Sequence, residues 1–150
     1  MIKFKPFCFI FLFLLINGLS IAQSLRVMTY NIRLDIDSDG VNSWANRKDN
    51  FCRQVQFYEP DIFGVQEARP NQVVDINTKL FQYNNIGIGR EGIGKGESSN
   101  IYYKKERFIV KEEKTFWLSE TPNEISKGWD AAYNRVCTYG LFKDKITKTL

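Results

Sequence analysis

The stretch Asp61-Ile-Phe-Gly-Val-Gln-Glu-Ala68 is the starting point for predicting the fold of this chain. It contains an apolar run that ends on a charged side chain. Residues 61–66 are largely apolar and have the length of a strand, and Glu67 stands directly at their end. A carboxylate taken out of water is costly unless it is paired, hydrogen-bonded or bound to a metal. The sequence therefore predicts that this strand ends at a site and not simply at a turn.

The segments on either side of this stretch alternate between strand and helix patterns. Residues 25–32 predict a strand, and residues 38–46 predict a loop because they are rich in Asp, Asn, Gly and Ser. Residues 47–58 have an apolar helical face, with Asn46 as the expected N-cap and Asp49 in the first turn. A second helix is expected to begin at Pro70, and it places Val73, Ile76 and Leu80 on one face.

Strand-like segments dominate the rest of the chain. They cover residues 83–88, 100–103, 108–118 and 135–142, with loops over residues 89–99 and 119–134. The length of 150 residues and the apolar content of 43% allow one domain with its own core. We therefore expect an α+β fold, in which two helices cover one face of a mixed sheet.

The order strand, helix, strand brings Asn31 and Glu67 together. Such a connection is almost always a right-handed crossover between parallel strands, so both strands end at the same edge of the sheet. If the strands are neighbours or one strand apart, the two side chains lie within about 5 to 10 Å of each other. A carboxylate and an amide suit a hard cation such as Mg²⁺. Alternatively, Glu67 caps or salt-bridges a solvated strand end, and Asn31 bonds to the turn.

Two stretches carry a resemblance to a known family. Val27-Met-Thr-Tyr-Asn-Ile-Arg33, followed by Asp61-Ile-Phe-Gly-Val-Gln-Glu67, resembles the endonuclease/exonuclease/phosphatase superfamily, which includes deoxyribonuclease I-like nucleases, neutral sphingomyelinases and inositol-polyphosphate phosphatases. Further stretches are similar to its secreted bacterial branch and occur in the same order: Trp44–Arg47, Ile101–Phe108, Phe116–Pro122, Gly128–Asp130 and Arg135–Thr138. The resemblance covers nearly the whole chain after residue 22.

The resemblance implies the N-terminal half of a four-layer α/β-sandwich of the deoxyribonuclease I-like type. It also implies a metal-dependent phosphoesterase that uses Mg²⁺ or Mn²⁺, with Glu67 and Asn31 at the metal and Arg135 on the phosphate. These three residues are the expected catalytic set. Substrate-binding residues at the rim would be Glu97, Asn100 and Tyr102. The substrate would be a phosphate ester in a nucleic acid, a phospholipid head group, or a sugar or inositol phosphate.

One departure from the family pattern limits this expectation. The family's later motifs carry a histidine and aspartates that activate water, and they normally follow the strand that begins near Arg135. This sequence ends at Leu150 and contains no histidine. We therefore interpret residues 23–150 as a truncated N-terminal part of the domain that is inactive alone. A non-catalytic binding module or a calcium-binding secreted module is the alternative.

The first 22 residues have the pattern of a secretory signal peptide. Lys3 and Lys5 precede ten consecutive apolar residues, 7–16, and small residues follow at Ser20 and Ala22. The apolar run is shorter than the roughly 20 residues that span a bilayer, so we expect no stable membrane span. Export to the periplasm or the medium is the predicted location. Removal of this segment lowers the formal net charge from +4 by two charges, which leaves no polyanion-binding surface.

Three further patterns leave alternatives open. Cys52 and Cys137 would be exported, so they either form a disulfide or remain small side chains among apolar neighbours. Residues 35–40, Asp-Ile-Asp-Ser-Asp-Gly, match the opening of an EF-hand loop, but Asn46 stands where the bidentate acid belongs. Residues 89–96 resemble a phosphate-binding loop, but a glycine replaces its Ser or Thr and a strand is expected to follow.

Overall fold

A four-stranded mixed sheet forms the centre of the structure, with strand order β1-β2-β4-β3. Its strands are β1 (Val27–Asn31), β2 (Ile62–Gln66), β3 (Tyr83–Ile86) and β4 (Ile101–Lys104). Strands β1 and β2 are parallel, as the crossover rule requires, and β4 pairs antiparallel with both β2 and β3. The computed structural model describes residues 24–150, and the predicted leader over residues 1–22 lies outside this range.

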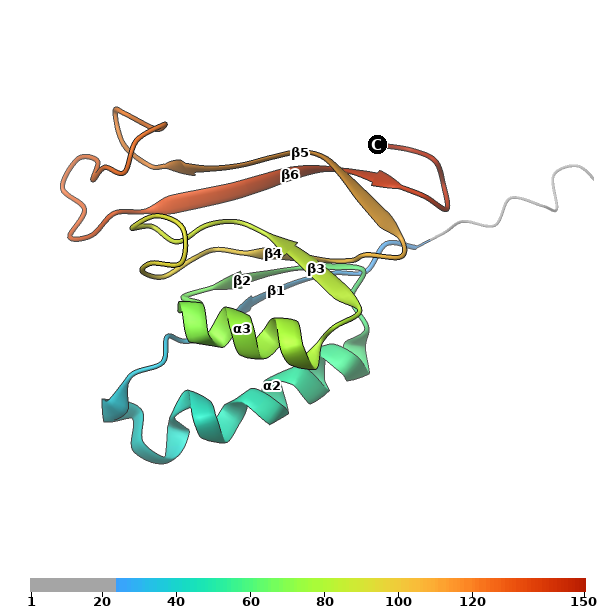
Figure 1. Ribbon diagram of the computed structural model, residues 1–150, viewed down its shortest axis with the longest axis horizontal. Coiled ribbons are helices and arrows are strands. Elements are labelled where there is room, and N and C mark those ends of the chain that lie inside the picture. Colours follow the sequence, from blue (N-terminus) through green and yellow to red (C-terminus); the bar gives the residue numbers. More distant parts are fainter. Residues whose placement is uncertain (1–23) are drawn as a thin grey trace, which may run out of the picture.

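Two different layers cover the two faces of this sheet (Figure 1). Helices α2 (Trp44–Tyr58) and α3 (Pro70–Lys79) pack on one face. The other face is covered by a separate antiparallel pair of strands, β5 (Phe108–Trp117) and β6 (Val136–Asp144). The predicted α+β fold with two helices on one face of a mixed sheet is confirmed.

Each interface between layers has its own apolar cluster. The helix side buries the larger one, whose residues include Trp44, Phe51, Val55, Phe63, Val65, Ile76, Leu80 and Tyr102. The other side buries a smaller cluster of Ile86, Tyr103 and Phe108, against which Phe142 of β6 packs. Burial of apolar surface is the main favourable contribution to folding, so the helix side provides most of the core.

Helix α2 begins earlier than the sequence pattern predicts. It starts at Trp44 with Ser43 in the N-cap position, so the predictions of Asn46 as N-cap and of Asp49 in the first turn are wrong. The indole of Trp44 is 2% exposed, and its Nε1 donates a hydrogen bond to Asp75 Oδ2 at 2.8 Å. Packing against α3 therefore recruits an extra turn that propensity alone does not reveal.

Several other boundaries move by a few residues. The predicted loop over residues 38–46 contains a short 3₁₀ segment, η2 (Asp37–Asn42), in which Gly40 has a φ of 50°. Strand β3 ends at Ile86 and not at residue 88. Strand β6 continues past residue 142 because Asp144 pairs in register with Phe108. The changes in the strands come from cross-strand pairing, which a local pattern cannot specify.

The two cysteines of the described range are free thiols, so the alternative of a disulfide is wrong. Cys52 is buried on α2, and burial raises the pKa of its thiol to about 11. Cys137 is exposed on β6. Between residues 24 and 150, no helix has the length and apolarity that crossing a membrane requires.

A network of ion pairs surrounds Asp61, the residue just before β2. The buried carboxylate of Asp61 pairs with Lys104 Nζ at 3.1 Å and with Arg107 Nη1 at 2.8 Å, and it accepts the backbone N–H of Arg26 at 2.9 Å. Arg107 also pairs with Asp144 at 2.8 Å. Burial opposes ionisation of Asp61, but its hydrogen bonds and cationic partners outweigh burial and hold its pKa below the usual range. The charge of Asp61 is therefore compensated within the protein and serves the stability of the fold.

Candidate active site

Asn31 and Glu67 meet at the carboxyl edge of the parallel pair. Asn31 pairs in register with Gln66, the last residue of β2, and the backbone N–H of Ile32 continues the ladder to Gln66 O at 3.2 Å. Glu67 therefore lies one residue beyond the pairing of Asn31. The Nδ2 of Asn31 donates a hydrogen bond to Glu67 Oε1 at 2.9 Å. The predicted meeting of these two side chains is thus a direct contact between neighbouring strands.

The carboxylate of Glu67 is held by hydrogen bonds and not by a cation. Its second oxygen, Oε2, accepts the backbone N–H of Leu34 at 3.2 Å. No lysine or arginine forms a salt bridge with it in the part of the chain that the structure describes. The backbone at Glu67 has a φ of 63°, an uncommon conformation for a residue other than glycine. The turn therefore presents an oriented carboxylate that forms no salt bridge within residues 24–150.

The amide of Asn31 is oriented by the turn that follows β1. Its Oδ1 accepts the backbone N–H of Arg33 at 2.9 Å, and its Nδ2 consequently faces Glu67. In this orientation Asn31 fixes the rotamer of the Glu67 carboxylate. Direct ligation of a cation through Oδ1 would share that oxygen with the Arg33 N–H.

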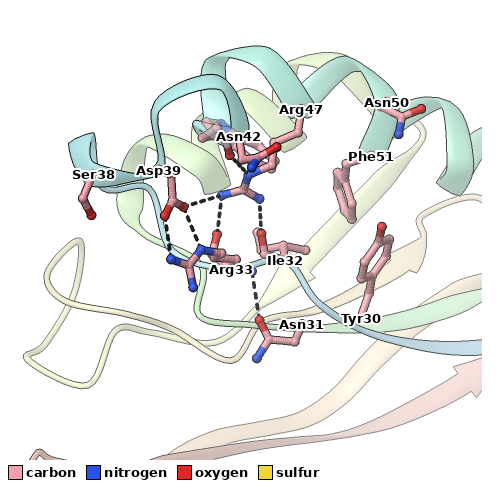
Figure 2. Close-up of a pocket in the computed structure, with 11 residues that line it drawn as sticks. Tyr30, Asn31, Ile32, Arg33, Ser38, Asp39, Asn42, Arg47, Asn50 and Phe51 are labelled. Atoms are coloured by element: carbon pink, nitrogen blue, oxygen red, sulfur yellow. Dashed lines mark hydrogen bonds and ion pairs between the residues drawn. The ribbon is translucent and has the colours of Figure 1, made fainter.

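Charged side chains also hold the segment after β1 in place (Figure 2). Arg47 donates to the backbone oxygens of residues 32–34 and to Asn42 O. Arg33 Nε donates to Asp39 Oδ2 at 2.7 Å, and this hydrogen bond is the main reason that the pKa of Asp39 is lowered. These residues line an open cavity of about 660 Å³ beside Asn31. They fix the turn from which Leu34 and Arg33 reach the site.

The same contacts exclude the EF-hand interpretation. Asp39 is paired with Arg33, and Asp35 accepts a hydrogen bond from Asn71 Nδ2 at 2.8 Å. No three carboxylate, thiol or imidazole side chains converge as metal ligands in residues 24–150. A closed calcium loop is therefore not formed by residues 35–46.

A short ladder ties the glycine-rich loop to the end of β2. Ala68 and Ser98 form a bridge in which Ser98 N donates to Ala68 O at 2.8 Å and Ala68 N donates to Ser98 O at 3.2 Å. Gly89 lies close to the backbone of Lys95, and a Cβ added to Gly89 would lie 1.8 Å from the carbonyl oxygen of Lys95. The glycines therefore close a tight loop against β2, and β4 follows it. A phosphate-binding loop would require a helix there, so that interpretation is wrong.

This ladder completes a cavity of about 250 Å³ at the carboxyl edge of β1 and β2. Four of the predicted site residues line it together: Asn31, Glu67, Glu97 and Arg135. Arg135 precedes β6, and its backbone oxygen accepts the N–H of Leu118 at 2.8 Å. The cavity therefore joins residues from both sheets, and it holds two carboxylates and at least one guanidinium.

Asn100 and Tyr102 lie outside this cavity. Asn100 is 3% exposed, and its Nδ2 donates to Asn85 Oδ1 at 2.9 Å while its Oδ1 accepts from Ser98 Oγ at 2.5 Å. Tyr102 is buried on the helix side, where its ring stacks on Phe63 with a centroid distance of 4.8 Å. Burial raises the pKa of the Tyr102 hydroxyl well above its usual range. Both side chains therefore support the strands that carry the site without lining its cavity.

Arg90 lines the cavity although the sequence does not single it out. Its Nη2 lies 3.0 Å from Glu97 Oε1, and both side chains are mostly buried. Arg90 and Glu97 are seven positions apart within a glycine-rich loop, so their contact depends on the fold of that loop. The one local signal is that a large cation stands inside a segment otherwise rich in glycine and small polar residues.

The donor chemistry of the cavity fits a hard divalent cation. Glu67 supplies carboxylate oxygens, and the amide oxygen of Asn31, which accepts the Arg33 N–H, lies on the same side chain whose Nδ2 donates to Glu67. Mg²⁺ is usually bound through one or two carboxylates and completes its coordination with water and phosphate oxygens. Because residues 24–150 form no cluster of three acidic, thiol or imidazole ligands, the fit is to such an open site and not to a closed cage.

Solved structures similar to this chain decide its family. The endonuclease/exonuclease/phosphatase from Bacteroides vulgatus is 40% identical with a TM-score of 0.83, over 85% of this chain and 49% of that chain. The mannosyl-6-phosphatase from Bacteroides thetaiotaomicron is 43% identical with a TM-score of 0.81, over 83% of this chain and 48% of that chain. The chain belongs to the endonuclease/exonuclease/phosphatase superfamily. Its deoxyribonuclease I-like fold is thereby confirmed.

Less similar solved structures share the fold alone with this chain. The catalytic domain of human Nocturnin is 18% identical with a TM-score of 0.64, over 83% of this chain and 45% of that chain. No protein-family model and no curated protein sequence matches the chain. The chain spans about half the length of the superfamily structures that it resembles.

Proposed function

We propose that this chain forms the cation- and phosphate-binding part of a Mg²⁺-dependent phosphoesterase. The observation that carries the proposal is the cavity in which Glu67 and Arg135, an unpaired anion and an exposed cation, face a common space. An anion without a cationic partner favours a metal ion, and a guanidinium favours a phosphate group. A phosphate ester bound together with Mg²⁺ would satisfy both requirements at once.

Each residue has a distinct role in this proposal. Glu67 holds Mg²⁺ or Mn²⁺, and Asn31 orients the Glu67 carboxylate through the 2.9 Å hydrogen bond. The ion, when bound, stabilises the negative charge that develops on the phosphoryl oxygens. Arg135 binds the phosphate through parallel N–H groups, which match its geometry better than a lysine would.

The proposed substrate is a sugar phosphate. A mannosyl-6-phosphatase is 43% identical to this chain over 83% of this chain's length. At such similarity the loops around a site are often related. The formal net charge of the whole chain is only +4, which gives little electrostatic attraction for a long nucleic acid. A small phosphorylated sugar needs one phosphate site and no extended basic groove.

The chain has no imidazole to activate water, because it contains no histidine. Proton transfer at neutral pH is most often carried out by a group whose pKa lies near 7. We therefore propose that these 150 residues bind the ion and the phosphate ester without rapid turnover. Hydrolysis would depend on residues that this chain does not contain.

The test measures binding of Mg²⁺ by calorimetry, first without and then with mannose 6-phosphate. Wild type is expected to bind the ion, and Glu67→Gln is expected to weaken binding at least about tenfold, or about 1.4 kcal/mol. Asp37→Asn is the matched control, since Asp37 is an exposed acid in η2 outside the cavity. Equal Mg²⁺ affinity in wild type and Glu67→Gln would rule out the proposed metal site. Loss of binding in Asp37→Asn alone would place the ion outside the cavity and would contradict the proposed metal site.

The phosphate side is tested separately with Arg135→Gln. This variant is expected to keep its affinity for Mg²⁺ and to lose mannose 6-phosphate binding at least about tenfold. Adenosine 5′-monophosphate and phosphocholine serve as competing phosphate esters with a nucleoside and a lipid head group. Tighter binding of either one than of mannose 6-phosphate would contradict the proposed substrate class while leaving the phosphate site intact.

A further inference from the structure

Arg90 stands where the two loops that wall the cavity meet. Its guanidinium pairs with Glu97 at 3.0 Å within the glycine-rich loop. The same guanidinium lies 5.0 Å from the ring centroid of Tyr133, which belongs to the loop that precedes β6. A guanidinium over an aromatic face is a favourable cation–π contact. Arg90 therefore connects one wall of the cavity to the other.

The backbone of Arg90 is anchored as firmly as its side chain. Its N–H donates to Glu97 O at 2.8 Å, and its carbonyl oxygen accepts Trp117 Nε1 at 2.8 Å and Asn134 Nδ2 at 3.4 Å. Trp117 ends β5, and Asn134 immediately precedes Arg135. The position of Arg90 is thus fixed relative to the residue proposed to bind phosphate.

The local backbone is shaped to receive the Arg90 side chain. Gly96 has a φ of 68°, and an added Cβ there would lie 3.2 Å from Arg90 Cγ. It would also lie 3.0 Å from the carboxyl carbon of Glu91. A side chain at position 96 would therefore be strained and would push against Arg90.

The charges of the cavity explain why a cation is needed at this point. Glu67 and Glu97 are both acidic, and both line the space that a phosphate would enter. Like charges repel strongly when they are partly removed from water. Arg90 neutralises Glu97, so only Glu67 is left for the metal ion. Without Arg90, a second uncompensated carboxylate would face the incoming phosphate.

We propose that Arg90 is a positioning residue of the phosphate site. It acts through Glu97 and through the segment that carries Arg135, and it does not itself contact the substrate. This inference rests on the proposed function, because it assigns Arg90 a part in the binding of phosphate. It goes beyond that proposal by predicting that the loss of Arg90 can be compensated at a second residue.

The test is a double-substitution cycle read out as the affinity for inorganic phosphate in saturating Mg²⁺. Arg90→Gln is expected to weaken phosphate binding about tenfold, because it leaves Glu97 unpaired. Adding Glu97→Gln is expected to restore affinity to within about threefold of wild type. Arg90→Lys is expected to retain most of the affinity. Arg53→Gln, at an exposed position on α2, is the control and should match wild type.

The outcomes separate positioning from direct contact. If the double variant Arg90→Gln/Glu97→Gln binds phosphate as weakly as Arg90→Gln, the unpaired Glu97 is not the cause of the loss and the proposal is overturned. If Arg90→Gln binds phosphate like wild type, the proposal is also overturned. If wild type does not bind phosphate, the proposed function is refuted. Hydrogen exchange without ligand then decides whether Arg90 connects the two walls of the cavity.

Hydrogen exchange of backbone amides tests the connection between the walls without any ligand. In Arg90→Gln, amides of residues 96–98 and of residues 134–136 are both expected to exchange faster than in wild type. Arg90→Lys should exchange at intermediate rates, and Arg53→Gln should exchange like wild type. Faster exchange in neither segment, or in the first segment alone, would show that Arg90 does not hold the two walls together.

Discussion

Strand β2 carries an acidic residue at each end, and the two acids have opposite surroundings. Asp61, just before the strand, is 4% exposed and has two cationic partners, Lys104 and Arg107, at 3.1 and 2.8 Å. Glu67, just after it, has hydrogen bonds from Asn31 and the Leu34 backbone and no salt bridge within residues 24–150. The first end joins β2 to its neighbours, whereas the second end leaves its charge for a ligand.

The two ends of β2 thus serve stability and function separately. Around Asp61 the protein supplies the countercharge, so the ion pairs form when the chain folds. Around Glu67 the protein supplies only orientation, so the countercharge has to come from outside. We therefore expect substitutions at the first end to change the free energy of unfolding, and substitutions at the second to change ligand affinity.

The largest expected effect is the loss of stability in Asp61→Asn. This change removes the carboxylate that Lys104 and Arg107 share and leaves Arg107 with Asp144 alone. Removing one member of a buried ion pair typically costs about 3 to 5 kcal/mol, and the lower value is expected because Asp144 remains. Urea unfolding monitored by tryptophan fluorescence would measure the change. Glu67→Gln is the control at the other end of the strand and should change the free energy of unfolding by less than about 1 kcal/mol. Equal destabilisation by both substitutions would show that the two ends of β2 do not differ in their contribution to stability.

An intermediate effect is expected for Asn31→Ala on the affinity for Mg²⁺. Removing a group that orients a metal ligand typically weakens binding about 10- to 100-fold, and the lower value is expected at this open site. Titration calorimetry with MgCl₂ would measure the change. Asn71→Ala removes an exposed amide that bonds to Asp35 and should leave the Mg²⁺ affinity unchanged. An unchanged affinity in Asn31→Ala would show that Glu67 needs no orienting partner.

The smallest expected effect is a change in how stability depends on pH. The pKa of Asp61 is lowered in the folded chain, as is that of Asp144, which Arg107 holds through a hydrogen bond. A lowered pKa means that the unfolded chain binds protons more readily, so stability is lost as the pH falls below about 4. Urea unfolding at pH 7, 5, 4 and 3 should show this loss. The loss should be shallower in Asp61→Asn, and an unchanged slope would remove Asp61 from the explanation.

The crossover from β1 to β2 could be predicted because it depends on local patterns and on one rule of handedness. Residues 61–66 read as a strand, and the following Glu67 was placed beside Asn31 by that rule alone. The same logic could not give the insertion of β4 between β2 and β3, because antiparallel pairing there depends on contacts across the whole chain. The order of the sheet is therefore a result of long-range packing.

In the candidate site, too, some residues can be predicted from the sequence and others depend on tertiary contacts. Asn31, Glu67, Glu97 and Arg135 could be selected from the sequence, and they line one cavity. Tyr102 carries a reactive group in the sequence, but the alternation of β4 directs its ring into the helix-side core. Arg90 could not be selected, because its partners Glu97 and Tyr133 meet it only when two loops have folded.

The left-handed backbone at Glu67 has a consequence for how this position can change over generations. With a φ of 63°, the residue occupies a conformation that costs a non-glycine side chain about 1 to 2 kcal/mol. A glycine would relieve this strain, so selection for folding alone would favour the loss of the carboxylate. A glutamate at such a position lowers the stability of the fold and keeps the carboxylate available for a ligand. A lineage that no longer needed the ligand would be expected to lose Glu67 early and to gain stability by doing so.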